Sequence, residues 1–135
     1  MLKQISVFLE NKAGRLAEVT RVLGENNVGL SALSIADTTD FGILRLIAEP
    51  TEAAESALRK AGFMVNATKV IGISIDDTPG ALVKALDTLQ QLKIDVEYIY
   101  AFEGRAHNTA VGIFKVTGDP EVAEAALKSA GVELL

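Results

Sequence analysis

The first half of the chain is repeated in the second half, and this duplication constrains the possible folds more than any other feature. Residues 5–35 align with residues 71–101 without a gap, with apolar positions and glycines in the same order. After an insertion in the second copy, the alignment resumes and ends on Gly62 and Gly131. Matches kept in order over half a chain indicate two copies of one module. We therefore expect modules at residues 1–66 and 67–135.

Each copy has the same order of predicted elements. Residues 5–10 alternate between apolar and polar, which is typical of a half-buried strand, and the next apolar residues recur at helical spacing. Asp119-Pro120 in the second copy provides a helix cap and a first-turn proline. The order βαββαβ, twice, predicts an α+β protein of two ferredoxin-like modules, antiparallel sheets with helices on one face. The remaining first-copy elements are expected over 30–36 and 43–48 (strands joined around Thr38-Thr39-Asp40), 53–61 (helix) and 63–68 (strand).

The composition argues against several classes of function. Among 135 residues there is no cysteine and one histidine, so cysteine nucleophiles and thiolate or multi-histidine metal sites are excluded within one chain. The formal net charge is −5, the opposite of a nucleic-acid-binding surface. No signal peptide pattern or membrane-length apolar run is present, which predicts a cytoplasmic protein with no membrane partner. No nucleophile elbow, Walker loop or dinucleotide fingerprint occurs, so we expect no catalytic residues, cofactor or metal.

A similar loop follows the first strand of each copy. Asn or Asp in this loop is suited to capping the coming helix, and glycine permits a ligand to approach the main chain closely. Free N–H groups at a helix start attract a carboxylate. The loop can therefore hold a zwitterion, although the same residues also make an ordinary strand-to-helix turn. The loop residues are Asn11, Lys12, Ala13, Gly14, Arg15 and Leu16 in the first copy, and Asp77, Thr78, Pro79, Gly80, Ala81 and Leu82 in the second.

These loops resemble the Asn/Asp-x-Pro-Gly-x-Leu signature of the ACT domain, a small regulatory module that binds amino acids. The resemblance covers the whole chain as a tandem pair. It implies side-by-side pairing of modules through their second strands into an eight-stranded sheet. It also implies a ligand between the loop of one module and the second strand of the other, which adds Leu33 and Ile99 to the expected ligand-binding residues. The first loop departs from the signature at Ala13, and Lys12 and Arg15 make it more basic, which predicts unequal affinities.

The sequence thus predicts a sensor or regulatory protein without a catalytic domain, with an amino acid held between ACT modules. A homodimer is expected, with a regulated enzyme or another protein as partner. The apolar residues Leu16, Leu33, Leu82 and Ile99 favour a branched or aromatic amino acid. Two alternatives remain open. One is a structural or protein-interaction module without a ligand. The other is a phosphate-handling enzyme of acylphosphatase-like topology, in which Arg15 would contact the phosphate.

Overall fold

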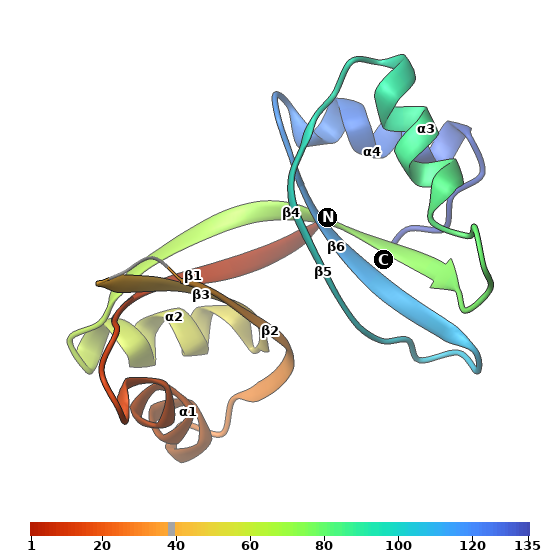
Figure 1. Ribbon diagram of the computed structural model, residues 1–135. Coiled ribbons are helices and arrows are strands. Elements are labelled where there is room, and N and C mark those ends of the chain that lie inside the picture. Colours follow the sequence, from red (N-terminus) through yellow and green to blue (C-terminus); the bar gives the residue numbers. More distant parts are fainter. Residues whose placement is uncertain (38–39) are drawn as a thin grey trace. The chain divides into compact units, whose positions relative to one another are not determined.

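The structure is a computed structural model that describes residues 1–37 and 40–135. It divides into two compact units, Lys3–Thr68 and a second unit made of Lys69–Leu135 together with Met1–Leu2. We call these the first and second modules, and Figure 1 shows them with their helices and strands labelled. The expected turn at Thr38-Thr39 lies outside the described residues.

The first module is an antiparallel sheet with both helices on one side (Figure 1). The strand order is β2-β3-β1-β4. Alternate residues of β1, such as Ile5 and Val7, lie opposite Leu46 and Leu44 of β3, and all four are fully buried. They form one core with helix residues such as Leu23. The elements are β1 (Leu2–Glu10), α1 (Arg15–Glu25), β2 (Gly29–Asp37), β3 (Phe41–Glu49), α2 (Thr51–Lys60) and β4 (Met64–Asp76).

The second module repeats this arrangement with the strand order β4-β6-β5. Ile71 of β4 lies opposite Phe114 of β6, and both pack in a core with Leu89 and Leu127 from the two helices. The two helices again lie on the same side of the strands (Figure 1). The additional elements are α3 (Val83–Gln91), β5 (Val96–Glu103), β6 (Thr109–Val116) and α4 (Pro120–Ser129).

The predicted helix signals are confirmed at several positions. Asp119 caps α4 by accepting a hydrogen bond from the N–H of Glu121 at 2.9 Å, and Pro120 stands in the first turn. After α2 and α4 the chain turns through Gly62 (φ 91°) and Gly131 (φ 79°), where glycine avoids the cost of a left-handed backbone. Asn27 likewise has φ 55° after α1. Capping residues and glycines next to the helices therefore determine most helix ends.

The expected count of eight strands is wrong, because the structure has six over the residues it describes. The strand predicted over 63–68 and the first strand expected in the second copy are a single strand, β4. Nothing between them breaks an extended backbone, since the segment contains neither glycine nor proline. The last predicted strand is reduced to one bridge, between Ile73 and Leu134. The described residues of one chain therefore supply six of the eight strands that the resemblance implies.

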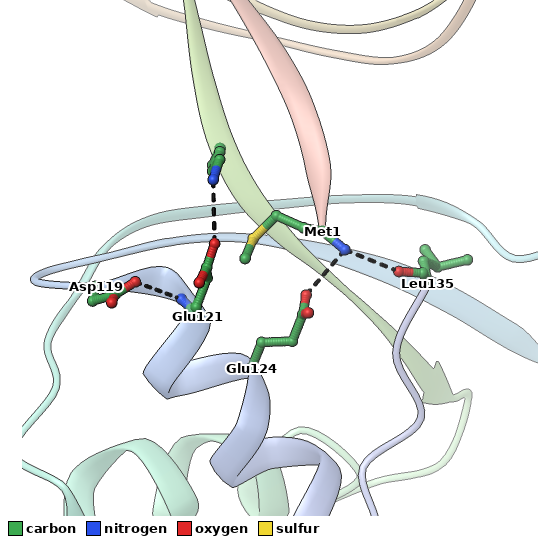
Figure 2. A network of polar contacts seen from close by, with 6 residues as sticks. Met1, Asp119, Glu121, Glu124 and Leu135 are labelled. Atoms are coloured by element: carbon green, nitrogen blue, oxygen red, sulfur yellow. Dashed lines mark hydrogen bonds and ion pairs between the residues drawn. The ribbon is translucent and has the colours of Figure 1, made fainter.

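The last residues of the chain pack beside β4, close to Met1 (Figure 2). Ser74 N–H donates to the carbonyl of Glu133 at 2.8 Å, and Leu135 N–H donates to the carbonyl of Gly72 at 3.0 Å. The ammonium of Met1 lies 3.0 Å from a carboxylate oxygen of Glu124 on α4. These contacts hold residues 131–135 against β4 and α4 in the second module.

Candidate functional site

The two strand-to-helix loops have the same backbone geometry. Gly14 has φ 88° and Gly80 has φ 83°, a left-handed conformation that side-chain-bearing residues adopt at a cost of about 1–2 kcal/mol. A Cβ atom added at either glycine would meet nothing within 4 Å. Glycine is therefore required for backbone conformation, and the space beside both loops is open.

Neither Asn11 nor Asp77 stands at the N-cap position of the helix that follows its loop, which corrects the prediction. The N-cap position is Gly14 for α1 and Leu82 for α3, and neither helix has a side-chain cap hydrogen bond. The backbone explains this, because the turn through each glycine places Asn11 and Asp77 before the cap position. Their N–H groups instead donate to the hairpin ends, Asn11 to the carbonyl of Asp40 at 3.0 Å and Asp77 to that of Asn108 at 2.7 Å.

The basic residues of the first loop are paired with carboxylates. Lys12 Nζ lies 2.8 Å from a carboxylate oxygen of Glu10. This hydrogen bond, together with the charge of Lys12 and a smaller contribution from Arg15, lowers the pKa of Glu10 below its usual value. Arg15 forms an ion pair with Glu18 at 2.8 Å, and its guanidinium carbon lies 5.0 Å from the centre of the Phe63 ring. Lys12 and Arg15 are thus both paired with carboxylates of the first module. This pairing weakens the alternative in which Arg15 binds a phosphate.

The second loop has no basic residue. Its turn is closed by backbone hydrogen bonds, from Ala81 N–H to the carbonyl of Thr78 at 3.2 Å and from Val83 N–H to that of Gly80 at 3.1 Å. Ala81 stands where the first loop has Arg15, and Lys84 stands where α1 has Glu18. Thr78, Pro79 and Gly80 leave the loop surface exposed. The two loops differ in charge, and the expected difference in their ligand affinities stays a prediction.

The two second-strand residues predicted for the site occupy equivalent positions. Leu33 lies opposite Leu46 on β3, and Ile99 lies opposite Phe114 on β6. Their partners are fully buried, so both residues point to the helix side of the sheet, yet Leu33 is 49% and Ile99 43% exposed. Over the residues that the structure describes, β2 pairs with β3 and β5 pairs with β6, and each of the two is an edge strand of its module. Each module therefore has an apolar residue on an edge strand, not covered by its own helices.

The structure brings together residues that the sequence analysis did not connect. Arg15 and Phe63 are far apart in the chain but in contact, and Lys84 lies beside residues 131–133. The internal alignment, carried one residue past Gly62 and Gly131, pairs Arg15 with Ala81 and Phe63 with Val132, and it gives no signal of this contact. Among residues 1–37 and 40–135, no cluster of metal-binding side chains is found. The same part of the chain has no helix long and apolar enough to cross a membrane.

Comparison with known proteins decides the family. The family described as an ACT domain pair matches residues 1–128. The chain belongs to the ACT domain pair family. Its two modules are therefore ACT modules, and the ferredoxin-like assignment is confirmed. None of the curated proteins matches the chain.

Solved structures extend this result. Protein BT0572 from Bacteroides thetaiotaomicron is 44% identical, with a TM-score of 0.92 over 99% of this chain and 91% of that one. The ligand-free regulatory subunit of aspartate kinase from Thermus thermophilus is 18% identical, with a TM-score of 0.71 over 96% and 90%. The corresponding subunit from Thermus flavus has a TM-score of 0.66 at 18% identity, with the same coverage. The two kinase subunits share the fold of this ACT pair.

Proposed function

We propose that this ACT pair is a regulatory protein that binds an amino acid and delivers its output to another polypeptide. The observation that carries the proposal is the combination, in both modules, of an open glycine loop with an exposed apolar residue on the edge strand. Support also comes from the family and from the fold shared with regulatory subunits of aspartate kinase. The glycine loops leave room for a ligand's carboxylate near the main chain, and Asn11 or Asp77 provides a side-chain oxygen for its ammonium.

We further propose that the ligand is held where the second strand of one module meets the loop of another, in a homodimer. An edge strand with free N–H and C=O groups is a template for pairing with another strand. The edges of β2 and β5 carry Leu33 and Ile99 on the helix side, and pairing would cover them. A ligand that binds only the paired state stabilises it, and a partner protein can respond to that shift. Contacts with Leu16, Leu33, Leu82 and Ile99 favour a branched or aromatic side chain.

Equilibrium dialysis tests the proposal. The protein is dialysed against an equimolar mixture of the twenty amino acids, and the retained amino acid is identified by mass spectrometry. We expect one amino acid to be enriched. The double variant Asn11→Ala/Asp77→Ala should weaken its retention about tenfold, since each change removes a hydrogen bond to a charged group. Asp87→Ala, on the exposed side of α3, is the matched control and should retain it fully.

The other outcomes separate the alternatives. If no amino acid is enriched, the ligand-binding proposal fails and a protein-interaction module without a ligand becomes the better account. Turnover of an acyl phosphate that is abolished by Arg15→Ala would instead support the phosphate-handling enzyme. Light scattering after gel filtration gives the mass in solution. A monomer at micromolar concentration, with and without the enriched amino acid, would contradict the homodimer.

A further inference from the structure

The edge strand of each module and the helix beside it share an exposed surface on the helix side of the sheet. Ile35 of β2 lies opposite the fully buried Leu44, so it points to the helix side, yet it is 48% exposed. Ala101 of β5 aligns with Ile35 and is likewise exposed. We call the two surfaces the edge surfaces. The first consists of Thr20, Gly24, Leu33 and Ile35, and the second of the aligned residues Leu86, Gln90, Ile99 and Ala101.

The helix residues of the edge surfaces lie on the flank that faces the edge strand. Helix α1 joins β1 to β2 and crosses β3, whereas α2 joins β3 to β4 and crosses β1, so α1 is the helix nearer β2. The same path places α3 nearer β5 than α4. A Cβ atom added at Gly131, which follows α4, would lie 3.3 Å from Nζ of Lys84, so Lys84 points towards the end of α4. Leu86 is two residues further along, about 200° around the helix, and therefore lies on the opposite flank, towards β5.

The two edge surfaces are complementary in the sizes of their side chains. On the helices the first surface has the smaller residues, with Thr20 in the place of Leu86 and a glycine one turn later. On the strands it has the larger residue, with Ile35 in the place of Ala101. Two first surfaces would leave a gap between their helices, and two second surfaces would crowd Leu86 against its own copy. A first surface packed on a second one fills the space.

The charges on the edge strands favour the same combination. Strand β2 has no charged side chain over residues 29–36, whereas β5 has Glu97 and Glu103 near its two ends. In the two registers of greatest overlap, an antiparallel pair of β5 strands places Glu103 of one copy opposite Glu97 or Asp95 of the other. Like charges directly opposite each other are destabilising, and Lys115, which lies 3.7 Å from Glu97, offsets only part of this repulsion. Pairing of β5 with the uncharged β2 avoids it.

We infer that each edge surface binds the other kind of edge surface on a second copy of this chain, so that β2 of one copy pairs with β5 of the other. Each copy has both surfaces, so two copies form two equivalent interfaces and close as a dimer. The pairing satisfies the exposed strand edges and buries apolar residues such as Leu33 and Leu86. The inference rests on the proposed homodimer and names the modules that pair. Dialysis tests the amino acid and the measurement below tests the pairing, so the two can fail separately.

A charge-swap experiment on the full chain tests this pairing. Ile35→Glu and Ala101→Lys change exposed, aligned positions on the two edge strands. Each single variant should raise the dissociation constant of the dimer at least about thirtyfold, because it buries a charge without a partner. In the double variant the two opposite charges meet across both interfaces, and the dissociation constant should return to within about threefold of that of the unmodified chain. Sedimentation equilibrium measures these constants.

The control Ile35→Glu/Ala125→Lys makes the same two kinds of change but places the lysine on an exposed position of α4, so it should dimerise as weakly as Ile35→Glu. If circular dichroism shows that Ile35→Glu does not fold, Thr20→Glu and Leu86→Lys repeat the swap on the facing helices. A double variant that dimerises more weakly than either single variant would indicate pairing of like modules. That result, or a dimer that both single variants leave unchanged, would overturn the inference and leave the homodimer intact. An unmodified chain that is monomeric would overturn both.

Discussion

The two modules keep the same backbone while their surfaces have diverged. Gly14 and Gly80 adopt nearly the same φ, and so do Asn27 and Lys93, at 55° and 56°. The second pair shows that the left-handed turn after the first helix of each module forms with asparagine in one copy and with lysine, a less suited residue, in the other. The packing of the rest of the module fixes this turn, so its conformation is the same with either side chain.

The side chains around the loops, unlike the backbone, differ between the two modules. In the first module Arg15 forms an ion pair with Glu18, whereas the aligned residues of the second module, Ala81 and Lys84, line a cavity. The second module also has exposed Val83 and Leu86 on α3, where α1 has Ala17 and Thr20. The comparison teaches that backbone geometry and surface charge vary separately in a duplicated fold, so the charged side chains around a loop in one copy do not recur in the other.

The largest expected effect lies in the cores, where the modules should behave alike. Leu58 and Leu127 align and are both fully buried. Replacement of either by alanine should lower the free energy of unfolding by about 3 kcal/mol, through lost burial and the cavity left behind. Urea unfolding followed by circular dichroism measures this. A loss below about 1 kcal/mol for only one of the two would break the equivalence of the cores.

The loop glycines should also respond alike. Gly14→Ala and Gly80→Ala should each cost about 1 kcal/mol, because both positions have positive φ and no steric neighbour. Gly24 within α1 is the matched control. It also has open space around it, but no positive φ, so Gly24→Ala should stabilise the protein by about 1 kcal/mol. Thermal unfolding gives all three values, and a stabilising Gly80→Ala would contradict the assigned backbone.

Arg15 is where the modules should differ. Arg15→Ala should cost about 1 kcal/mol, since it removes a partly exposed ion pair and a cation–π contact. A double-mutant cycle with Glu18→Ala should give a coupling energy of about 0.5 kcal/mol. The aligned pair Ala81→Gly and Lys84→Ala should show no coupling. A coupling energy near zero for Arg15 and Glu18 would mean that the arginine is not held in place by Glu18.

The smallest effect concerns Glu10, whose pKa is lowered mainly by its hydrogen bond with Lys12. A depressed carboxyl pKa contributes stability above the unfolded-state pKa, and this contribution is lost as pH falls through the folded-state pKa. Lys12→Ala should therefore raise the pKa of Glu10 towards its usual value and reduce the acid sensitivity of the first module. Carboxyl NMR titration measures the pKa. An unchanged pKa in Lys12→Ala would assign the shift to another neighbour.

Local and periodic signals were enough to predict the fold. The repeat, the alternation in β1 and the Asp119-Pro120 cap each act over a few residues, and each is found in the structure. The merged strand β4 was missed because an extended segment without glycine or proline carries no mark that separates two strands from one. The expected caps at Asn11 and Asp77 failed because the turn through a glycine three residues later moves the start of each helix beyond them.

The candidate site was less predictable. The loop residues follow from the repeated motif, and the exposed positions of Leu33 and Ile99 agree with a surface role. The contact of Arg15 with Phe63, and the cavity beside Lys84, depend on segments that are distant in sequence and meet only after folding. A pattern within one loop cannot show which distant side chain packs against it.

A thermal-shift screen of the unmodified chain against the twenty amino acids, each at millimolar concentration, tests the central claim most directly. A ligand at a hundred times its dissociation constant should add about 2.7 kcal/mol to the free energy of unfolding. For a chain of 135 residues this raises the melting temperature by several degrees. The account predicts a clear shift with an apolar amino acid and none with glycine or aspartate. Twenty unchanged melting curves would contradict amino-acid binding by this ACT pair.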